Sequence, residues 1–311
     1  MITMGKSAPV AVWGLLATSV VGVSFAGAIL QHVDEIPALM RASWRLQITV
    51  IMLLPFALLQ YKSMDKTLRL RIVEKRTILI IVGSGIALAA HFGSWVTSLD
   101  HTTLAHSLLF VTSHPLILII GIGLWIRKPH KLEIMGALFG LAGVAITLLD
   151  VSSDSNVTLF GDLLAFVGAV TVIGYIVAGR ILREWMPVFV YALPVTAIAA
   201  ISLIPISLMM EENVSAFGWI SSDLLYWFVL LAFLSGIVGH TGLNACLRWL
   251  SPLTISVSVT FEPILGAFIG WLFFDSGIPG MWTWIGGPLL IGGIILVIMG
   301  GDQIKFDSSE E

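Results

Sequence analysis

The chain has 311 residues, of which 57% are hydrophobic and 11% charged, with a net charge of −3 and a mean hydropathy of +0.98. A water-soluble domain of this length could not bury so much apolar surface, so these values exclude a soluble globular protein and predict a chain dissolved in lipid. The single cysteine, Cys246, excludes an intrachain disulfide.

Apolar stretches long enough to cross a bilayer recur along the whole chain. A spanning helix needs about 20 mostly apolar residues. In chain order, the sequence predicts ten such helices, at residues 8–30, 36–60, 78–99, 103–126, 132–150, 158–179, 187–210, 224–247, 252–274 and 281–300. We therefore predict an all-α, multi-pass integral membrane protein of a plasma, inner or organelle membrane.

The basic residues predict the orientation of these helices. Arg41 and Arg45 lie within the second helix, and the other fourteen fall on one side: Lys6, Lys62, Lys66, Arg69, Arg71, Lys75, Arg76, Arg127, Lys128, Lys131, Arg180, Arg183, Arg248 and Lys305. The opposite loops carry acidic residues and no Lys or Arg. The acidic residues are Asp34, Glu35, Asp100, Asp154, Glu211, Glu212 and Asp223. Because cytoplasmic loops are enriched in Lys and Arg, both termini are predicted to be cytoplasmic. The basic run 62–76 has the charge to contact anionic lipid or nucleic acid, but we interpret it as part of this topology signal and predict no nucleic-acid partner.

Short motifs repeat at a nearly constant interval. Pairs 147 to 150 residues apart are Trp13-Gly14 with Phe160-Gly161, Gly27 with Gly174, Pro37 with Pro187, Pro55 with Pro205, His91-Phe92-Gly93 with His240-Thr241-Gly242, Pro115 with Pro263, Gly136 with Gly286, and Gly143 with Gly293. Ordered matches of this kind predict a duplicated unit. We divide the chain into a first five-helix repeat (8–150), a second five-helix repeat (158–300) and a cytoplasmic tail (301–311). Because five is odd, the second repeat must be inverted, a plan found in secondary transporters.

These motifs resemble the EamA-type carriers of the drug/metabolite transporter superfamily over nearly the whole chain. The similar features are Pro37 followed by Arg45, Ser98-Leu99-Asp100-His101-Thr102-Thr103, Pro115, Gly136, Gly140, Gly143, Gly161-Asp162, Ser251-Pro252-Leu253, Glu262-Pro263, Gly286 and Gly293. The turn Phe273-Phe274-Asp275 departs from the usual Leu-Gly-Glu of that family. The resemblance implies an exporter or exchanger of small organic metabolites, among which amino acids, nucleotide-linked compounds and organic acids all occur.

Two arginines lie on one face of the predicted second helix. Arg41 and Arg45 are four residues apart, and at 1.5 Å per residue Arg45 lies roughly 13 Å into the membrane. Arg41 is shallow enough to extend to the outer interface, or else belongs to the substrate site. Arg45 keeps its charge and requires an acceptor, which is a substrate carboxylate or phosphate, Glu262, or a freed backbone carbonyl.

The fourth and ninth helices each carry a titratable residue immediately before a proline, His114-Pro115 and Glu262-Pro263. Proline removes a backbone donor and frees a carbonyl one turn earlier, so both prolines predict helix kinks near the midplane. Such a kink is tolerated where it faces protein or a wet cavity. We predict that His114 and Glu262 bind substrate or carry a coupled proton, the alternative being that each hydrogen-bonds only the loosened backbone.

Further candidates come from the third and eighth helices. His91 and His240 occupy matching positions, with Trp95 one turn after the first and Asn244 one turn after the second. An aromatic and polar wall of this kind suits a small organic ligand, although an intramembrane histidine also serves as an interhelical hydrogen-bonding group. We therefore include all four residues in the predicted substrate site.

The predicted mechanism is alternating access around a midplane cavity, with Arg45 attracting an anionic group of a small organic metabolite. The alternative substrate is a zwitterionic amino acid or a cationic or neutral metabolite, with Glu262 as its main contact. Metalloprotease, serine-protease and nucleotide-binding motifs are not found in the sequence, so we predict no enzyme and no metal or other cofactor. The expected partners are the substrate, the lipid bilayer and a proton or counter-substrate, for a monomer or homodimer. A channel, or a membrane chaperone or scaffold, is the competing class.

Overall fold

The computed structural model describes residues 8–102, 104–147, 149, 158–273 and 281–307. Lys6, Thr103, Asp154 and the turn residues Phe274 and Asp275 therefore lie outside the described residues, as do the last four residues of the predicted tail. Over the described part of the chain the structure contains helices and no strand, which agrees with the predicted all-α class.

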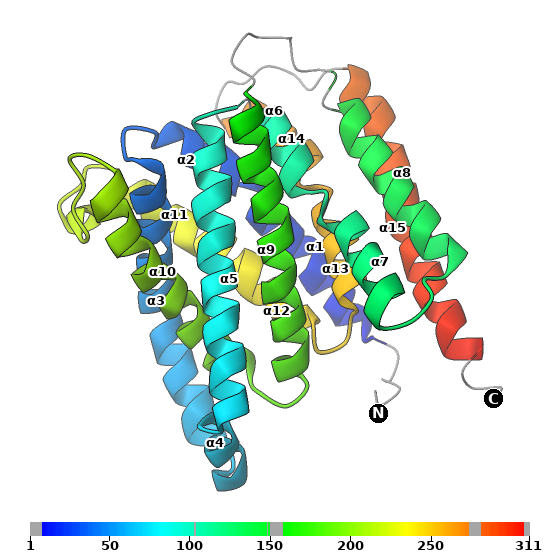
Figure 1. Ribbon diagram of the computed structural model, residues 1–311, viewed down its shortest axis with the longest axis horizontal. Coiled ribbons are helices and arrows are strands. Elements are labelled where there is room, and N and C mark those ends of the chain that lie inside the picture. The colour runs from blue at the N-terminus through cyan, green and yellow to red at the C-terminus, as the bar shows by residue number, and fades with distance from the viewer. Residues whose placement is uncertain (1–7, 103, 148, 150–157, 274–280, 308–311) are drawn as a thin grey trace.

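The helices follow one another in an order close to the predicted one (Figure 1). The α-helices are α1 (Val10–Ser24), α2 (Ala26–His32), α3 (Ala38–Ser63), α4 (Lys66–Ile72), α5 (Lys75–Leu99), α6 (Leu104–Val111), α7 (His114–Trp125), α8 (Lys131–Thr147), α9 (Leu159–Arg183), α10 (Val188–Met210), α11 (Leu225–Leu231), α12 (Gly242–Cys246), α13 (Pro252–Val259), α14 (Glu262–Phe273) and α15 (Met281–Asp307). A 3-10 turn, η2 (Gly218–Ile220), precedes α11, and a π-helix, η3 (Ala232–Thr241), joins α11 to α12.

Seven helical segments among the described residues are long and apolar enough to cross a membrane. They are Val10–His32, Ala38–Ser63, Lys75–Leu99, Leu159–Arg183, Val188–Met210, Leu225–Cys246 and Pro252–Phe273. The other three predicted spans correspond to α6 with α7, to α8 and to α15, of which His114–Trp125 and Trp284–Gly300 form shorter apolar helices. The start of α1, the end of α15 and helix α4 lie at the same end of the molecule (Figure 1).

Helices from the two halves of the chain pack against each other. α3 packs on α10, α5 on α9, α1 on η3, and α8 on α15. The last pair lies side by side at one edge of the molecule (Figure 1). There the backbones approach closely, because a Cβ on Gly136 would lie 2.5 Å from the Gly293 carbonyl oxygen and one on Gly143 would lie 2.7 Å from that of Gly286. Because residue numbers rise along α8 from 136 to 143 while those of the contacted residues fall from 293 to 286, α8 and α15 are antiparallel.

The paired helices α3 and α10 cap each other at both ends. The Glu211 carboxylate, just past the end of α10, accepts from the backbone N–H groups of Leu39 (2.6 Å) and Met40 (3.1 Å) in the first turn of α3. At the opposite end, the side-chain oxygen of Gln60 accepts from the Phe189 N–H in the first turn of α10 (2.9 Å). Each cap satisfies backbone donors that the helix itself leaves free, so the two helix ends hold one another.

Two helices that the sequence predicts to be kinked are instead interrupted. α6 ends at Val111 and α7 begins at His114, while α13 ends at Val259 and α14 begins at Glu262. Pro115 and Pro263 thus occupy the second position of a new helix, where the missing N–H is not needed for an intrahelical bond. The predicted kinks are corrected to complete breaks, and both breaks lie 148 residues apart in sequence.

Candidate functional site

A cavity lies between the two interrupted helices and encloses about 680 Å³ of space, including the part open to solvent. Its wall comes from both halves of the chain, because residues are contributed by α1, α2, α5, α6, α7, α9, η3, α12, α13 and α14. Val111 and Val259, the last residues before the two breaks, both line it. The prolines cannot donate to the carbonyl groups of these two residues, so the cavity is bounded by backbone that is available for hydrogen bonding.

Six of the eight predicted substrate residues line this cavity. They are His91, Trp95, His114, His240, Asn244 and Glu262. His114 and Glu262 begin α7 and α14, so the breaks place an imidazole and a carboxylate at matching points of the two halves. The side chain of His114 is hydrogen-bonded through Nδ1 to the Ser256 hydroxyl on α13. Among the described lining residues Glu262 is the one that carries a carboxylate, which can accept hydrogen bonds from a bound solute.

Aromatic rings form one wall of the cavity. The rings of His91 and Trp95 are nearly parallel, at 10° with centroids 6.2 Å apart, and His240 meets the Phe92 ring edge-on at 5.1 Å. His91 Nδ1 donates to the Gly168 carbonyl oxygen on α9 (2.9 Å), because a carbonyl can only accept. The other ring nitrogen, Nε2, is then the acceptor of the neutral imidazole. Flat rings at this spacing offer an apolar face to a planar or aliphatic solute.

Several polar atoms at the cavity have no hydrogen-bond partner among the described residues. Trp95 Nε1, a donor, and Asn244 Oδ1, an acceptor, are buried and unpaired. Asn244 Nδ2 is paired, because it donates to the Tyr175 hydroxyl and to the His240 carbonyl oxygen. Buried polar groups are normally hydrogen-bonded, so unpaired atoms in a cavity wall indicate a polar occupant.

Arg45 lies behind the cavity wall and reaches it through another residue. Its side chain is 1% exposed, and Nη2 donates to the hydroxyl of Ser235, a lining residue on η3, at 2.8 Å. The guanidinium stacks on the Phe92 ring at 4.1 Å, while Nε and Nη1 have no partner. Glu262 was one of the acceptors predicted for Arg45, but the described residues show no ion pair between the two. The acceptor that the structure shows is the hydroxyl of Ser235.

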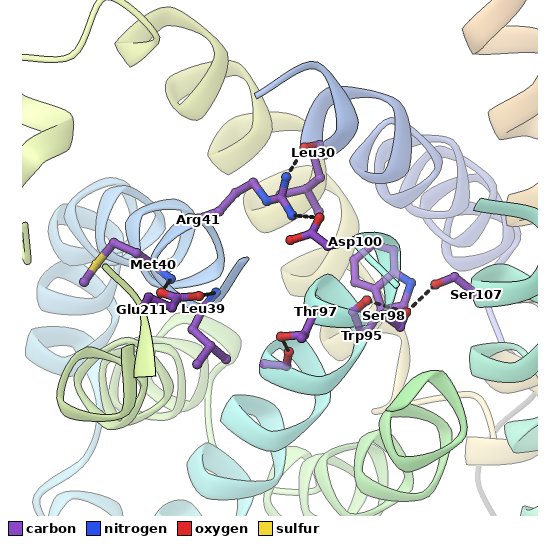
Figure 2. Close-up of polar contacts among 11 residues, drawn as sticks. Leu30, Leu39, Met40, Arg41, Trp95, Thr97, Ser98, Asp100, Ser107 and Glu211 are labelled. Atoms are coloured by element: carbon purple, nitrogen blue, oxygen red, sulfur yellow. Dashed lines mark hydrogen bonds and ion pairs between the residues drawn. The ribbon is translucent and has the colours of Figure 1, made fainter. Parts of the chain in front are cut away.

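Arg41 is separated from the cavity. Its Nη2 forms an ion pair with Asp100 at the end of α5 (2.5 Å), and its Nη1 donates to the Leu30 carbonyl oxygen on α2 (3.1 Å) (Figure 2). The arginine is 1% exposed, its partner Asp100 belongs to one of the predicted outer loops, and the cavity lining does not include it. The reason is geometric, since Asp100 lies within reach and satisfies the charge locally.

Figure 2 also shows Glu211 beside Leu39 and Met40, on the same stretch of α3 that carries Arg41. Both acidic groups of this region, Asp100 and Glu211, therefore bind α3 near its first turn. Arg45 lies one turn further along α3, so the contacts that hold the first turns of α3 also fix the position of Arg45. The site thus depends on how α3 is held as well as on its lining.

Three polar lining residues were not among the predicted site residues. Ser235, Tyr175 and Thr112 line the cavity. Thr112 lies in the break before α7, so its place next to His114-Pro115 was a usable signal. For Ser235 the sequence contained no such signal. Ser235 lies in the π-helix η3, in which each turn holds more residues than in an α-helix, so α-helical spacing does not predict that its side chain faces Arg45.

Comparison with known proteins agrees with this architecture. Residues 159–299 match the EamA-like transporter family, which confirms the predicted resemblance. Together with the seven apolar helices, this match identifies the chain as a multi-pass integral membrane protein whose second half is similar to the EamA-like transporter family. The matched residues cover the second half of the chain. Among curated proteins, no sequence matches it.

A solved structure described as "Crystal structure of protein" is similar to this chain over almost its full length. The two align with a TM-score of 0.76 and 16% sequence identity, covering 96% of this chain and 99% of that chain. At this identity the likeness concerns the fold alone. It extends over the first half of the chain, which the family match does not include.

Proposed function

We propose that this protein is a secondary carrier that moves a small organic metabolite across the membrane by alternating access, with the cavity as its substrate site. The observation that carries the proposal is the pair of helix breaks, 148 residues apart, that place His114 and Glu262 on one cavity between the two halves of the chain. Substrate sites at the interface of two repeats, formed by discontinuous helices, are characteristic of secondary transporters.

The proposed architecture is ten membrane helices in two inverted repeats, residues 8–150 and 158–300, with both termini cytoplasmic. Three structural pairs support it. The breaks match, the caps of α3 and α10 match at residues 39 with 189 and 60 with 211, and Gly136 meets Gly293 where Gly143 meets Gly286. Because α8 and α15 are corresponding helices and run antiparallel, the two halves have opposite directions at this contact.

The proposed solute carries an anionic group that interacts with Arg45 through Ser235. Arg45 is a buried charge with two unpaired nitrogens, and a serine hydroxyl that accepts from Arg45 can direct its own proton to a carboxylate or phosphate in the cavity. The second candidate is a zwitterionic amino acid or a cationic metabolite, favoured by the position of Glu262 in the lining itself. In this arrangement Glu262 or His114 exchanges the proton that couples the cycle.

Counterflow in proteoliposomes tests the transport activity and the charge of the solute together. Vesicles are preloaded with matched sets of one amino acid, the amine that lacks its carboxylate, and the acid that lacks its amino group. Uptake driven by the acid and the amino acid supports Arg45 as the recognition group, whereas uptake driven by the amine moves recognition to Glu262. Absence of counterflow for organic acids, amino acids, nucleotides and amines alike, with folded protein, contradicts the carrier proposal.

Substitutions test the site assignment in the same assay. We expect Arg45→Ala and Glu262→Gln to reduce counterflow at least a hundredfold, because each removes a charged group that interacts with the solute, Arg45 through Ser235 and Glu262 directly, while the protein remains folded and inserted. Glu184→Gln is the matched control, since it makes the same chemical change at an exposed carboxylate outside the cavity. Full transport by both cavity variants would contradict the assignment.

A further inference from the structure

Helix α4 (Lys66–Ile72) has no fully buried residue, and only its half-buried Leu68 and Ile72 pack against the hydrophobic core, although it connects two apolar helices. α3 ends at Ser63 and α5 begins at Lys75, and both are long enough to cross a membrane. A seven-residue helix confined between two such ends has to lie at the membrane surface. Figure 1 places α4 at the extremity of the molecule, beyond the ends of the neighbouring helices.

Two arginines determine how α4 is oriented. Arg69 donates to the carbonyl oxygens of Lys62 (2.6 Å) and Met64 (2.9 Å), at the end of α3, where a cation also complements the helix dipole. The Arg71 guanidinium stacks 4.4 Å from the ring centroid of Trp185, which lies between α9 and α10. Both arginines are therefore engaged within the protein, and α4 has a defined direction relative to the bundle.

The other cations of this segment are exposed. Lys62, Lys66, Lys75 and Arg76 all extend to the surface, beside the carboxylates Asp65 and Glu74. Leu70 is 59% and Val73 65% exposed, and with Lys66 they follow the spacing that places residues on one helix face. In water this apolar face would be unfavourable, whereas at the level of lipid headgroups leucine and valine enter the acyl boundary and the cations remain at the phosphates.

We propose that residues 62–76 form a binding surface for anionic phospholipid headgroups, with Leu70 and Val73 inserted beside them. The opposite charge of the lipid, the position between two spanning helices and the exposed apolar pair all favour this partner. A juxtamembrane cation contributes about a fivefold preference for anionic lipid, so removal of two cations should weaken binding on the order of 25-fold. This surface is independent of the cavity, and its test requires no transport.

The test measures the melting temperature of the full chain in neutral detergent during titration with phosphatidylglycerol or phosphatidylcholine. A ligand that binds the folded protein raises its melting temperature, and the midpoint of the titration reports affinity. The protein, the variant Lys66→Gln/Lys75→Gln and the control Lys128→Gln/Lys131→Gln are compared. The control removes the same charge at exposed lysines between α7 and α8. Glycerol phosphate without acyl chains distinguishes a lipid surface from a phosphate site.

We expect phosphatidylglycerol, but not phosphatidylcholine, to stabilise the protein, with a midpoint that rises at least tenfold in the α4 variant and less in the control. Leu70→Ser should also raise the midpoint, without changing the charge. Equal stabilisation by the two lipids, an equal shift in the two lysine variants, or equal stabilisation by glycerol phosphate would each overturn the proposal.

Discussion

At the scale of single residues, the small side chain of Ser235 supports the buried charge of Arg45. Its hydroxyl is fully buried and is the acceptor for Arg45 Nη2, the guanidinium nitrogen that has a partner. A buried charge without compensation is strongly unfavourable in a membrane protein, so this one hydrogen bond and the contact with Phe92 hold Arg45 in place. A bound solute with an acceptor group could accept the proton of the Ser235 hydroxyl and so stabilise the charge of Arg45 further.

We expect Ser235→Ala to lower the free energy of unfolding by about 1–3 kcal/mol, because it leaves a third nitrogen of Arg45 unsatisfied. Thermal unfolding in detergent measures the loss. Ser63→Ala is the control, since Ser63 is exposed and its hydroxyl donates to a carbonyl of its own helix. A loss as small as that of the control would show that Ser235 does not support Arg45.

Between elements, α8 and α15 approach closely through their backbones. A Cβ at Gly136 would lie 2.5 Å from a backbone oxygen of Gly293, and backbone cannot move aside as a flexible side chain can. Small residues at helix contacts are the means by which membrane helices pack without a hydrophobic driving force. The two helices therefore depend on glycine for their separation.

We expect Gly136→Ala to destabilise the protein by about 1–3 kcal/mol through overpacking. The matched change Gly292→Ala should be neutral or stabilise by up to about 1 kcal/mol, because a Cβ there meets nothing within 4 Å and alanine favours the helix. Melting temperatures of the two variants in one detergent check this pair. Equal effects would contradict the close antiparallel packing of α8 and α15.

The reciprocal caps of α3 and α10 differ in charge. Glu211 presents a carboxylate to the first turn of α3, while Gln60 presents a neutral amide to the first turn of α10. A negative group at a helix N-terminus interacts favourably with the dipole, and an amide does so less. The Glu211 end of the pair is therefore bound more firmly than the Gln60 end.

We expect Glu211→Gln to lower the free energy of unfolding by about 1 kcal/mol and Gln60→Glu to raise it by about 0.5 kcal/mol. Both effects should diminish with added salt, and thermal unfolding at low and high ionic strength measures them. If the two substitutions changed stability in the same direction, the caps would not act through charge.

For the whole molecule, the arrangement of charges and the proposed duplicated architecture make one prediction about topology. In a Cys246→Ser background, a cysteine at Glu212 should react with a membrane-impermeant maleimide added outside intact cells. Cysteines at Lys128 or Glu184 should react only after permeabilisation, because loops rich in Lys and Arg remain in the cytoplasm. All three positions are exposed, so burial does not explain a difference. Labelling of Lys128→Cys from outside would contradict the predicted orientation.

Much of the site was within reach of sequence reasoning. Charged and titratable residues are rare inside membrane helices, so Arg45, His91, His114, His240 and Glu262 stood out against an apolar background. All but Arg45 line the cavity. Arg41 was assigned to the same site, but it does not line the cavity and is paired with Asp100 instead. Helix periodicity could not predict this pair, because it relates only residues of one helix and Asp100 lies at the end of another.

Apolar length and the distribution of Lys and Arg determined by themselves that this chain belongs in a membrane, since the transfer of side chains to lipid is a property of local composition. The nearly constant offset between motifs predicts a duplication, and this stays a prediction. Only the tertiary structure decided that the prolines interrupt their helices, that Arg45 meets Ser235 across a π-helix, and that Arg41 binds Asp100. Each of these depends on the approach of distant segments, which packing selects among many locally equivalent alternatives.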